Sequence, residues 1–280
     1  MPEGWEWDET LFLGTAPYYV PGRLPYAPGL PDALRAALAL DGRGRLLDVG
    51  CGPGVLALSL VPHFATVVGV DPDAGMLAEA ARRASEAGVD NAHWVQLRAE
   101  DLPARLGRFR AVTFGQSFHW MERDRVAATI RTMLEPGGAF VHVSDLKTPP
   151  AAMADPPFPP PPHEAIRDLV RRFLGPVRRA GQGVLLHGTP GNEADILRRA
   201  EFTGPERLLV PADEVLVRST DDVVAAVFSR SDSAPHLFGA RLAEFETALR
   251  DLLHAASPAD RFAERAPDTE VMIWRKASES

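Results

Sequence analysis

The sequence predicts a doubly wound α/β fold, in which helices cover both faces of a mostly parallel sheet. Two observations carry this prediction. Apolar runs of strand length alternate with helical segments over residues 46–145, and the first run leads into the glycine-rich turn Gly50-Cys51-Gly52-Pro53-Gly54. Because neighbouring parallel strands need a long crossover between them, this alternation is typical of a parallel sheet with helices packed on it.

The composition is that of a globular chain, and it narrows the classes of protein. The 280 residues are 45% hydrophobic and 24% charged, which suits one large domain or a domain with a cap. The formal net charge of −8 argues against a nucleic-acid partner or an anionic membrane surface. No stretch approaches the roughly 20 apolar residues of a membrane span. The N-terminus lacks a secretion signal, and a single cysteine excludes an internal disulfide. We therefore expect a cytoplasmic protein.

Five strands and four helices are expected in the first half of the chain. Apolar periodicity and turn residues predict helices over 31–40, 55–61, 74–87 and 123–134. The same signals predict strands over 46–49, 66–71, 93–97, 110–115 and 139–144.

The turn after the first strand has the composition of a ligand-binding loop. Gly50, Gly52 and Gly54 permit positive φ and let a ligand lie against bare backbone. The helix that follows offers free N–H groups and the positive end of its dipole to ligand oxygens. A turn of purely structural purpose would have the same glycines, so residues further along the chain must decide.

The second strand supplies one such residue. Asp71 ends the strand about 20 residues after the glycines, where a carboxylate can accept both hydroxyls of a ribose. The alternative role of Asp71 is a helix N-cap, for which Asp73 is also suitably placed.

These residues resemble the cofactor loop of class I S-adenosylmethionine (SAM)-dependent methyltransferases of the small-molecule type, in which an acidic residue precedes Gly-x-Gly-x-Gly. Asp48 and the three glycines match that pattern, whereas the dinucleotide fingerprint G-x-G-x-x-G would need Gly or Ala at Val55. A Leu-x-Pro-Gly-Gly turn over 134–138 is a second mark of the family. The resemblance covers about residues 15–145. It implies a seven-stranded Rossmann-like sheet with a final antiparallel strand pair, SAM as cofactor, and S-adenosylhomocysteine (SAH) as product.

The resemblance also implies which residues bind the cofactor. The segment 18–26 resembles an entry segment that folds over SAM, with Arg23 paired to the methionine carboxylate. A surface arginine beside packing tyrosines is the other interpretation. Met76 would pack against the adenine, and either Glu100 or Asp101 would accept its exocyclic amine. The expected cofactor-binding residues are Tyr19, Arg23, Asp48, Gly50, Cys51, Gly52, Gly54, Asp71, Pro72, Met76, Ala99, Glu100, Asp101, Gln116 and Ser117.

The methyl acceptor is expected at the end of the fourth strand. The turn Gln116-Ser117-Phe118-His119-Trp120 follows it, and small-molecule methyltransferases often have a similar turn there. His119 is the candidate catalytic residue, as a base or to orient the acceptor, with lining of the cofactor pocket as the alternative. We expect Tyr18, His119 and Trp120 to contact the substrate. No metal site is expected, because no group of His, Asp and Glu has the spacing of metal ligands.

The remainder of the chain predicts a lid and the end of the sheet. Residues 149–162 contain eight prolines and indicate an extended linker or lid segment. Helices are expected over 164–174, 193–200, 221–228 and 235–256, a strand or strand pair over 207–217, and a strand over 269–275. The predicted domains are an N-terminal lid segment with the first helix (1–40), a SAM-binding core (41–147), a Pro-rich and helical acceptor-lid insertion (148–204), and the C-terminal part of the core sheet with its helices (205–280).

The predicted function is transfer of a methyl group from SAM to an O, N or C atom of a small organic acceptor. The only cysteine, Cys51, lies in the cofactor loop, so no cysteine nucleophile is available. One alternative is a protein of this fold that binds SAM or SAH without methylating, such as a cyclase or a binding protein. An NAD(P)-dependent oxidoreductase is disfavoured by Val55. The expected partner is a small molecule and neither nucleic acid nor membrane, for a monomer or homodimer.

Overall fold

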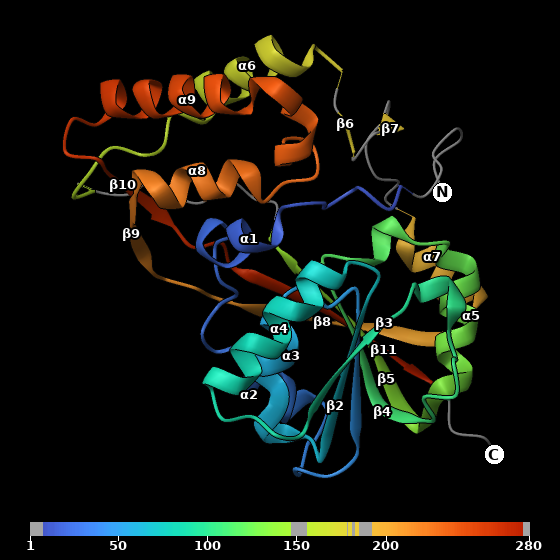
Figure 1. Cartoon of the computed structure of the whole chain (residues 1–280). Coiled ribbons are helices and arrows are strands. Elements are labelled where there is room, and N and C mark those ends of the chain that lie inside the picture. Colours follow the sequence, from blue (N-terminus) through green and yellow to red (C-terminus); the bar gives the residue numbers. More distant parts are fainter. Residues whose placement is uncertain (1–7, 147–155, 178, 181–182, 185–191, 277–280) are drawn as a thin grey trace.

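The computed structural model describes residues 8–146, 156–177, 179–180, 183–184 and 192–276 (Figure 1). Its centre is a seven-stranded sheet with the strand order β3-β2-β1-β4-β5-β11-β8. β11 runs antiparallel to both of its neighbours, and the other pairings in this sheet are parallel. The prediction of a doubly wound, mostly parallel, seven-stranded sheet is confirmed.

The strand order reverses between β1 and β4, which lie side by side in the sheet although β2 and β3 come between them in the chain. In open α/β sheets ligands bind beyond the carboxyl ends of the strands at such a reversal. The strands of the sheet are β1 (Arg45–Val49), β2 (Thr66–Asp71), β3 (Ala92–Gln96), β4 (Phe109–Gly115), β5 (Leu134–Asp145), β8 (Phe202–Val210) and β11 (Thr269–Lys276). The helices packed around it are α2 (Leu30–Ala37), α3 (Val55–Leu60), α4 (Ala74–Glu86), α5 (Arg123–Met133) and α7 (Glu193–Arg199).

Apolar side chains alternate between the two faces of the sheet and form a core on each. Leu46 and Val67 belong to a buried cluster that includes residues of α2 and α3. Their neighbours Leu47 and Val68 belong to a second cluster, which includes residues of α5 and α7. Successive side chains of a strand point to opposite faces, so near-continuous apolar runs bury both faces at once. The sheet is thereby a rigid support for the loops at its carboxyl edge.

A second, helical part of the molecule, here called the cap, lies beyond that edge of the sheet (Figure 1). It consists of α6 (His163–Leu174), α8 (Thr220–Phe228), the 3₁₀ segment η4 (Pro235–Arg241) and α9 (Leu242–Ala256). These elements share their own apolar cluster, in which the rings of Phe238 and Phe245 stack with centroids 4.0 Å apart. The antiparallel pair β9 (Val215–Ser219) and β10 (Arg261–Arg265) connects the cap to the sheet. The two-residue strands β6 (Arg179–Ala180) and β7 (Gly183–Val184) pair with each other.

The short helix α1 (Ala16–Gly22) lies between the cap and the core, in contact with α8 and with α4 (Figure 1). Arg218 of β9, which is 6% exposed, holds the C-terminal end of α1 in place. Its guanidinium donates to the carbonyl oxygens of Pro21 and Gly22 at 3.0 and 2.8 Å. It also donates to the carbonyl of Asp222 and to Glu264 at 2.8 and 3.0 Å. One buried cation therefore links α1 to α8 and to β10.

Three local expectations differ from the structure. The single helix expected over 235–256 is interrupted at Gly239, where the backbone leaves helical values (φ 52°, ψ −130°), so η4 and α9 are separate. The strand β10 was not expected at all. The segment 207–217, expected as a strand or strand pair, contains the end of β8 and the start of β9, and β9 pairs with β10 outside the main sheet. The helix expected over 55–61 ends at Leu60 and continues as the 3₁₀ turn η1 (Val61–His63), which contains Pro62.

The expected lid divides between two parts of the structure. α6 belongs to the cap, whereas Ile196 and Leu197 of α7 pack in the core beside α5. Residues 147–155 of the Pro-rich stretch lie outside the described residues. The domain division itself stays a prediction.

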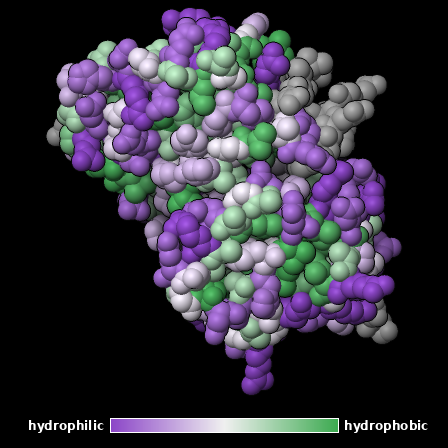
Figure 2. Space-filling view, in the orientation of Figure 1, coloured by the Kyte–Doolittle hydropathy of each residue, from purple (hydrophilic) through white to green (hydrophobic). Residues whose placement is uncertain are grey.

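Hydrophilic residues cover most of the visible surface of the cap, and hydrophobic ones gather on the core near β3 (Figure 2). This agrees with the position of β3 at the edge of the sheet, where Trp94 and Val95 are only half buried. None of the described helices has both the length and the apolar character needed to cross a membrane.

Candidate functional site

Two adjoining cavities lie at the carboxyl ends of β1 and β4, where the strand order reverses. The larger cavity has a volume of about 690 Å³, part of it open to solvent, and the smaller one about 580 Å³. Both are lined by Tyr19, Gly50, Gly115 and Gln116, so they meet at these residues. An elongated ligand with two chemically different halves could occupy both.

Gly52 and Gly54 of the turn after β1 have different tasks. Both have positive φ, 52° and 72°. Gly52 lines the larger cavity, and a Cβ added there would meet no atom within 4 Å, so that space is open to a ligand. A Cβ at Gly54 would come within 2.7 Å of the Trp94 ring, so Gly54 permits close packing of α3 against β3. Gly54 lines neither cavity, and its contact with the cofactor stays a prediction.

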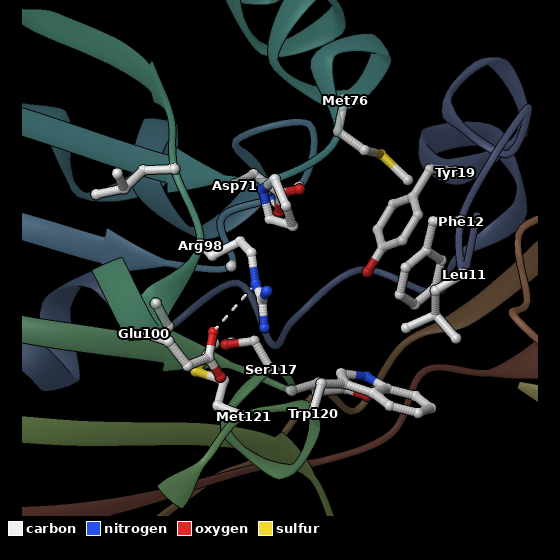
Figure 3. A pocket seen from close by; sticks show the side chains of 17 residues that line it. Leu11, Phe12, Tyr19, Asp71, Met76, Arg98, Glu100, Ser117, Trp120 and Met121 are labelled. Atoms are coloured by element: carbon white, nitrogen blue, oxygen red, sulfur yellow. Dashed lines mark hydrogen bonds and ion pairs between the residues drawn. The ribbon is translucent and has the colours of Figure 1, made fainter. Parts of the chain in front are cut away.

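Asp71 is fixed at the end of β2 with its carboxylate at the wall of the larger cavity (Figure 3). Its Oδ2 accepts from the backbone N–H of Gly52 at 2.8 Å, and its Oδ1 accepts from the N–H of Asp73 at 2.9 Å. Burial raises the pKa of Asp71 to about 6, against these two hydrogen bonds, which lower it. The N-cap of α4 is Asp73, whose Oδ1 accepts from Met76 N–H at 2.9 Å. Asp71 is therefore free of the capping role and available to a ligand.

The larger cavity has an apolar lining on the sides away from Asp71. Pro72 and Met76 follow β2, and Leu97 and Ala99 follow β3. Leu11 and Phe12, from the segment before α1, lie beside Trp120 (Figure 3). The rings of Phe12 and Trp120 meet edge to face, with centroids 6.1 Å apart.

Arg98 and Glu100 form a charged pair in the same cavity. The Arg98 Nε lies 3.6 Å from Glu100 Oε2, and the Arg98 side chain extends into the centre of the cavity (Figure 3). Glu100 Oε1 accepts from the backbone N–H of Glu122 at 2.9 Å, which ties the turn to the start of α5. Asp101 is exposed and lines neither cavity. The sequence left open whether Glu100 or Asp101 contacts the adenine. Only Glu100 lines the cavity in the structure.

The smaller cavity contains a buried carboxylate, Asp48, with unused hydrogen-bonding capacity. Its Oδ1 accepts from Thr113 Oγ1 at 2.7 Å. Its Oδ2 is buried and has no well-aligned hydrogen-bond partner among the described residues, although the backbone of Ala57 lies near enough to lower the pKa. Burial outweighs both effects and raises the pKa of Asp48 to about 7. A cationic group in this cavity would satisfy the Oδ2 and restore the ionised form.

Arg23 is the cation of the smaller cavity, and the cap holds it there. Its Nη2 donates to the carbonyl of Ser229, which ends α8, at 3.0 Å. Its guanidinium also lies over the ring of Tyr19, 5.1 Å from the centroid. Burial raises the pKa of Tyr19 and of Tyr26, which lines the same cavity, so both phenols are neutral near pH 7.

Gln116 and Asp145 complete the polar lining of the smaller cavity. Gln116 has a positive φ of 54°, which a residue other than glycine seldom adopts, and its backbone N–H donates to Val143 O at 2.9 Å. Its side chain hydrogen-bonds to the carboxylate of Asp145 at the end of β5. Burial raises the pKa of Asp145, while Gln116 and the charge of Arg23 lower it.

Most of the residues expected to bind the cofactor come together at the two cavities. Those that line one or both are Tyr19, Arg23, Asp48, Gly50, Cys51, Gly52, Asp71, Pro72, Met76, Ala99, Glu100, Gln116 and Ser117. Gly54 and Asp101 do not. The role of each of these residues in binding stays a prediction.

The three residues expected at the acceptor lie in different places. Trp120 lines the larger cavity, whereas His119 lines neither, although its ring lies 4.8 Å from that of Trp120. Tyr18 packs into the apolar cluster of the cap, with its ring centroid 5.1 Å from that of Phe228. The structure thus brings Trp120 to the site and does not bring Tyr18 there.

Sequence reasoning missed Arg98, Asp145, Leu11 and Phe12. Asp145 ends β5 and Arg98 follows β3, so the rule that ligands bind at the carboxyl ends of parallel strands could have indicated both. Leu11 and Phe12 lie in an irregular segment whose sequence contains no comparable signal.

Comparison with known proteins agrees with this geometry. Residues 46–138 match a family model described as a methyltransferase domain. Over 132 residues the chain is 34% identical to an uncharacterized methyltransferase of Mycobacterium tuberculosis, covering 47% of this chain and 51% of that protein. Over 162 residues it is 30% identical to an S-adenosyl-L-methionine-dependent Diels-Alderase of Talaromyces variabilis, covering 52% and 54%. The chain thus spans about half the length of these two curated relatives.

The fold is also similar to that of the cyclase SpnF, whose crystal structure matches with a TM-score of 0.53. The match covers 92% of this chain and 87% of that one at 21% identity. The region 46–138 therefore forms a methyltransferase domain of the class I, Rossmann-like type, and the resemblance inferred from the glycine-rich turn is confirmed.

Proposed function

We propose that this protein binds SAM across the two cavities and transfers its methyl group to an O, N or C atom of a small organic acceptor. The observation that carries the proposal is the chemical difference between the cavities. The larger one presents an apolar wall and the carboxylate of Asp71, which suit an adenosine. The smaller one presents Arg23 beside the buried Asp48, which suit an α-amino acid.

The residues present fit SAM. Asp71 would accept the ribose hydroxyls, Met76 would pack against the adenine, and Glu100 would accept the exocyclic amine. Arg23 would pair with the methionine carboxylate. The buried Asp48 Oδ2, which has no well-aligned hydrogen-bond partner among the described residues, would receive the ammonium group.

When bound, SAM supplies an electrophilic methyl group for an in-line displacement. This chain then has to hold an acceptor in line with the methyl carbon and exclude water, and positioning of this kind accounts for most of the rate enhancement such a reaction needs. The aromatic wall formed by Phe12 and Trp120 is suited to an apolar acceptor. The net charge of −8 supports a small molecule over a nucleic acid. His119 remains the predicted base, with its ring 4.8 Å from that of Trp120.

A second candidate function is a SAM-dependent cyclisation without methyl transfer. It is favoured by one observation, the 30% identity to a SAM-dependent Diels-Alderase over 52% of this chain. In such a protein the apolar wall would fold a reactive chain, and SAM would remain intact.

Calorimetric titration with SAM, SAH and NADH in parallel tests the proposed cofactor. We expect binding of SAM and SAH and none of NADH, because the turn after β1 lacks the third glycine of the dinucleotide pattern. Binding of NADH alone would overturn the proposal. Incubation of the SAM complex with a panel of phenols, amines, enolisable ketones and linear polyenes that carry a diene and an alkene then separates the two functions, with mass spectrometry for SAH and chromatography for cyclised isomers. SAH formation supports methyl transfer, and a cyclised product without SAH supports the second candidate.

A further inference from the structure

The smaller cavity has an uneven set of charges. Among the described residues that line it, Arg23 carries one positive charge, and the carboxylates of Asp48 and Asp145 carry two negative ones when ionised. A ligand that balances this set has one anionic and two cationic groups. The methionine part of SAM has this composition, with a carboxylate, an ammonium and a sulfonium. SAH lacks the third charge, because its sulfur is a neutral thioether.

Asp145 lines the smaller cavity and is tied by a hydrogen bond to Gln116, a residue at which the two cavities meet. It ends β5, with Thr269 of β11 opposite it in the ladder. Its carboxylate accepts a hydrogen bond from the side chain of Gln116, one of the residues that line both cavities. The left-handed backbone of Gln116 is the kind of local strain that persists at functional sites when surrounding contacts hold it. Gln116 therefore acts as a fixed support for this carboxylate.

Asp48 is the other carboxylate that lines the smaller cavity. It lies within β1, and its carboxylate is fixed by Thr113 of β4, two residues before Gly115. The sulfur of SAM joins the ribose to the methionine chain, so it must lie where the two cavities meet. The carboxylate of Asp145 is hydrogen-bonded to Gln116, which lines both cavities, so it can lie close to the sulfur. Asp48 is then left for the ammonium group.

We propose that Asp145 is the counter-charge of the sulfonium, and that this site thereby distinguishes SAM from SAH by charge. The inference rests on the proposed function, because it needs SAM as the ligand. This charge pairing would favour release of the product. Once the methyl group has left, the Asp145 carboxylate faces a neutral sulfur and no longer has a cationic partner.

The preference for SAM over SAH should depend on pH. The charged and titratable groups around Asp145 are Arg23, Asp48, Tyr19 and Tyr26, and burial raises the pKa of both tyrosines, which keeps them neutral. The sulfonium lowers the pKa of Asp145 in the SAM complex, whereas in the SAH complex it stays raised by burial. The SAM complex therefore binds fewer protons, and the SAM-to-SAH affinity ratio rises with pH until Asp145 is ionised in both complexes. Asp48 faces the same ammonium in both, so its titration cancels from the ratio.

The test is calorimetric titration of SAM and SAH into the wild-type chain and the Asp145→Asn variant, at about pH 5.5 and about pH 8. For the wild type we expect the affinity ratio to be roughly tenfold larger at the higher pH, the effect of a one-unit pKa change. For Asp145→Asn we expect a smaller ratio that is the same at both pH values. Asp90→Asn is the matched control, because Asp90 is exposed and lines neither cavity, and it should behave like the wild type.

A second readout does not depend on the variant folding correctly. Repeating the wild-type titrations in two buffers of different ionisation enthalpy measures the protons taken up, and SAH should bind with greater uptake than SAM. Equal uptake, or a pH-independent ratio in the wild type, would overturn the role of Asp145 while leaving SAM binding intact. Failure of the wild type to bind either ligand would instead overturn the proposed function, and this inference with it.

Discussion

The side chain of Asp48 lowers the stability of the folded protein when it is ionised, and it also has a proposed role in ligand binding. The residue is 1% exposed, and burial raises the pKa of its carboxyl group to about 7, well above the value of about 3.9 expected in an unfolded chain. Between these two values the native state holds a proton that the unfolded state has lost. Stability therefore falls as the pH rises through this window, and the ligand-free protein must carry an unfavourable buried charge above it.

The Asp48→Asn variant should thus be stabilised selectively at high pH. Relative to the wild type, we expect its free energy of unfolding to improve by about 2 kcal/mol more at pH 8 than at pH 5, since the buried charge is removed. Urea unfolding of both proteins without ligand measures this difference. SAM affinity should fall in the same variant, because the counter-charge of the ammonium is lost. A stability difference that does not change between pH 5 and pH 8 would show that Asp48 is ionised in the folded as well as the unfolded protein, so that burial does not raise its pKa.

Asp71 should contribute to binding more than to folding. Its two hydrogen bonds to Gly52 and Asp73 hold the loop, and its remaining acceptor capacity faces the larger cavity. We expect Asp71→Ala to weaken SAM binding by about 1.5–3 kcal/mol, since hydrogen bonds to a charged group are lost. Isothermal calorimetry measures the affinity.

The matched control for Asp71 is its neighbour Asp73. Asp73→Ala removes the N-cap of α4, so it should lower stability by about 1 kcal/mol while leaving SAM affinity nearly unchanged. Equal losses of affinity in the two variants would contradict the ribose-binding role of Asp71.

The site residues that could be predicted lie at the end of a strand and also belong to a recognisable local sequence pattern. Asp71, Gly50 and Gly52 follow from the run of apolar residues and from glycine spacing, because both are properties of adjacent positions in the chain. Arg98 and Asp145 were missed since their importance arises from what faces them across the cavity. Gly54 was expected to contact the cofactor, but its neighbour is Trp94, 40 positions further along, and no local pattern shows that contact.

At the level of elements, the position of α1 depends on the cap. α1 has seven residues and contains Pro21, too short to be stable alone, so its place is determined by the elements around it. Arg218 accounts for much of this, because its guanidinium binds two carbonyls at the end of α1, one carbonyl of α8 and the carboxylate of Glu264. Tyr19 and Arg23 belong to the segment that Arg218 fixes.

Replacing Arg218 should therefore affect a site that it does not touch. We expect Arg218→Met to lower the free energy of unfolding by about 3 kcal/mol or more, because Glu264 and the carbonyls lose a buried partner. SAM affinity should fall as well, as α1 loses its attachment. Chemical denaturation and calorimetry measure the two effects.

Arg250→Met is the control for this substitution. Arg250 forms ion pairs with Asp221 and Glu246 at the surface of the cap, and such exposed pairs contribute about 0–1 kcal/mol. The proposed link between the cap and the site would be wrong if Arg218→Met lost stability but bound SAM as tightly as the wild type.

For the whole molecule, the core was far more predictable than the cap. The alternation of strands and helices predicts a parallel doubly wound sheet, and right-handed connections leave few possible strand orders for it. The cap is built from α6, α8 and α9, and the main-sheet strand β8 separates α6 from the other two in the chain. Its helices show apolar faces, but periodicity does not reveal which faces meet. For the same reason α7 was grouped with α6 although it packs on the core.

Ligand binding should stabilise the molecule as a whole, because the site includes residues of the core and the segment held by the cap. At a SAM concentration of roughly 100 times the dissociation constant, mass action adds about 2.7 kcal/mol to the folded state. For a chain of this size we expect the melting temperature to rise by about 5 °C. Differential scanning fluorimetry with SAM, and with NADH as the control ligand, tests this. An equal shift with NADH would speak against a SAM site.

The position of β11 has a consequence for synthesis on the ribosome. β11 lies between β5 and β8 and joins β8 to the sheet, yet it begins about 120 residues after β5 ends. While those residues are being translated, β5 presents an unpaired edge that strands of other nascent chains could join. The cap sequence is made during this interval, and its helices can form locally before the sheet is complete. A chaperone that covers open sheet edges should therefore raise the yield of folded protein during synthesis, even if the folded protein is itself stable.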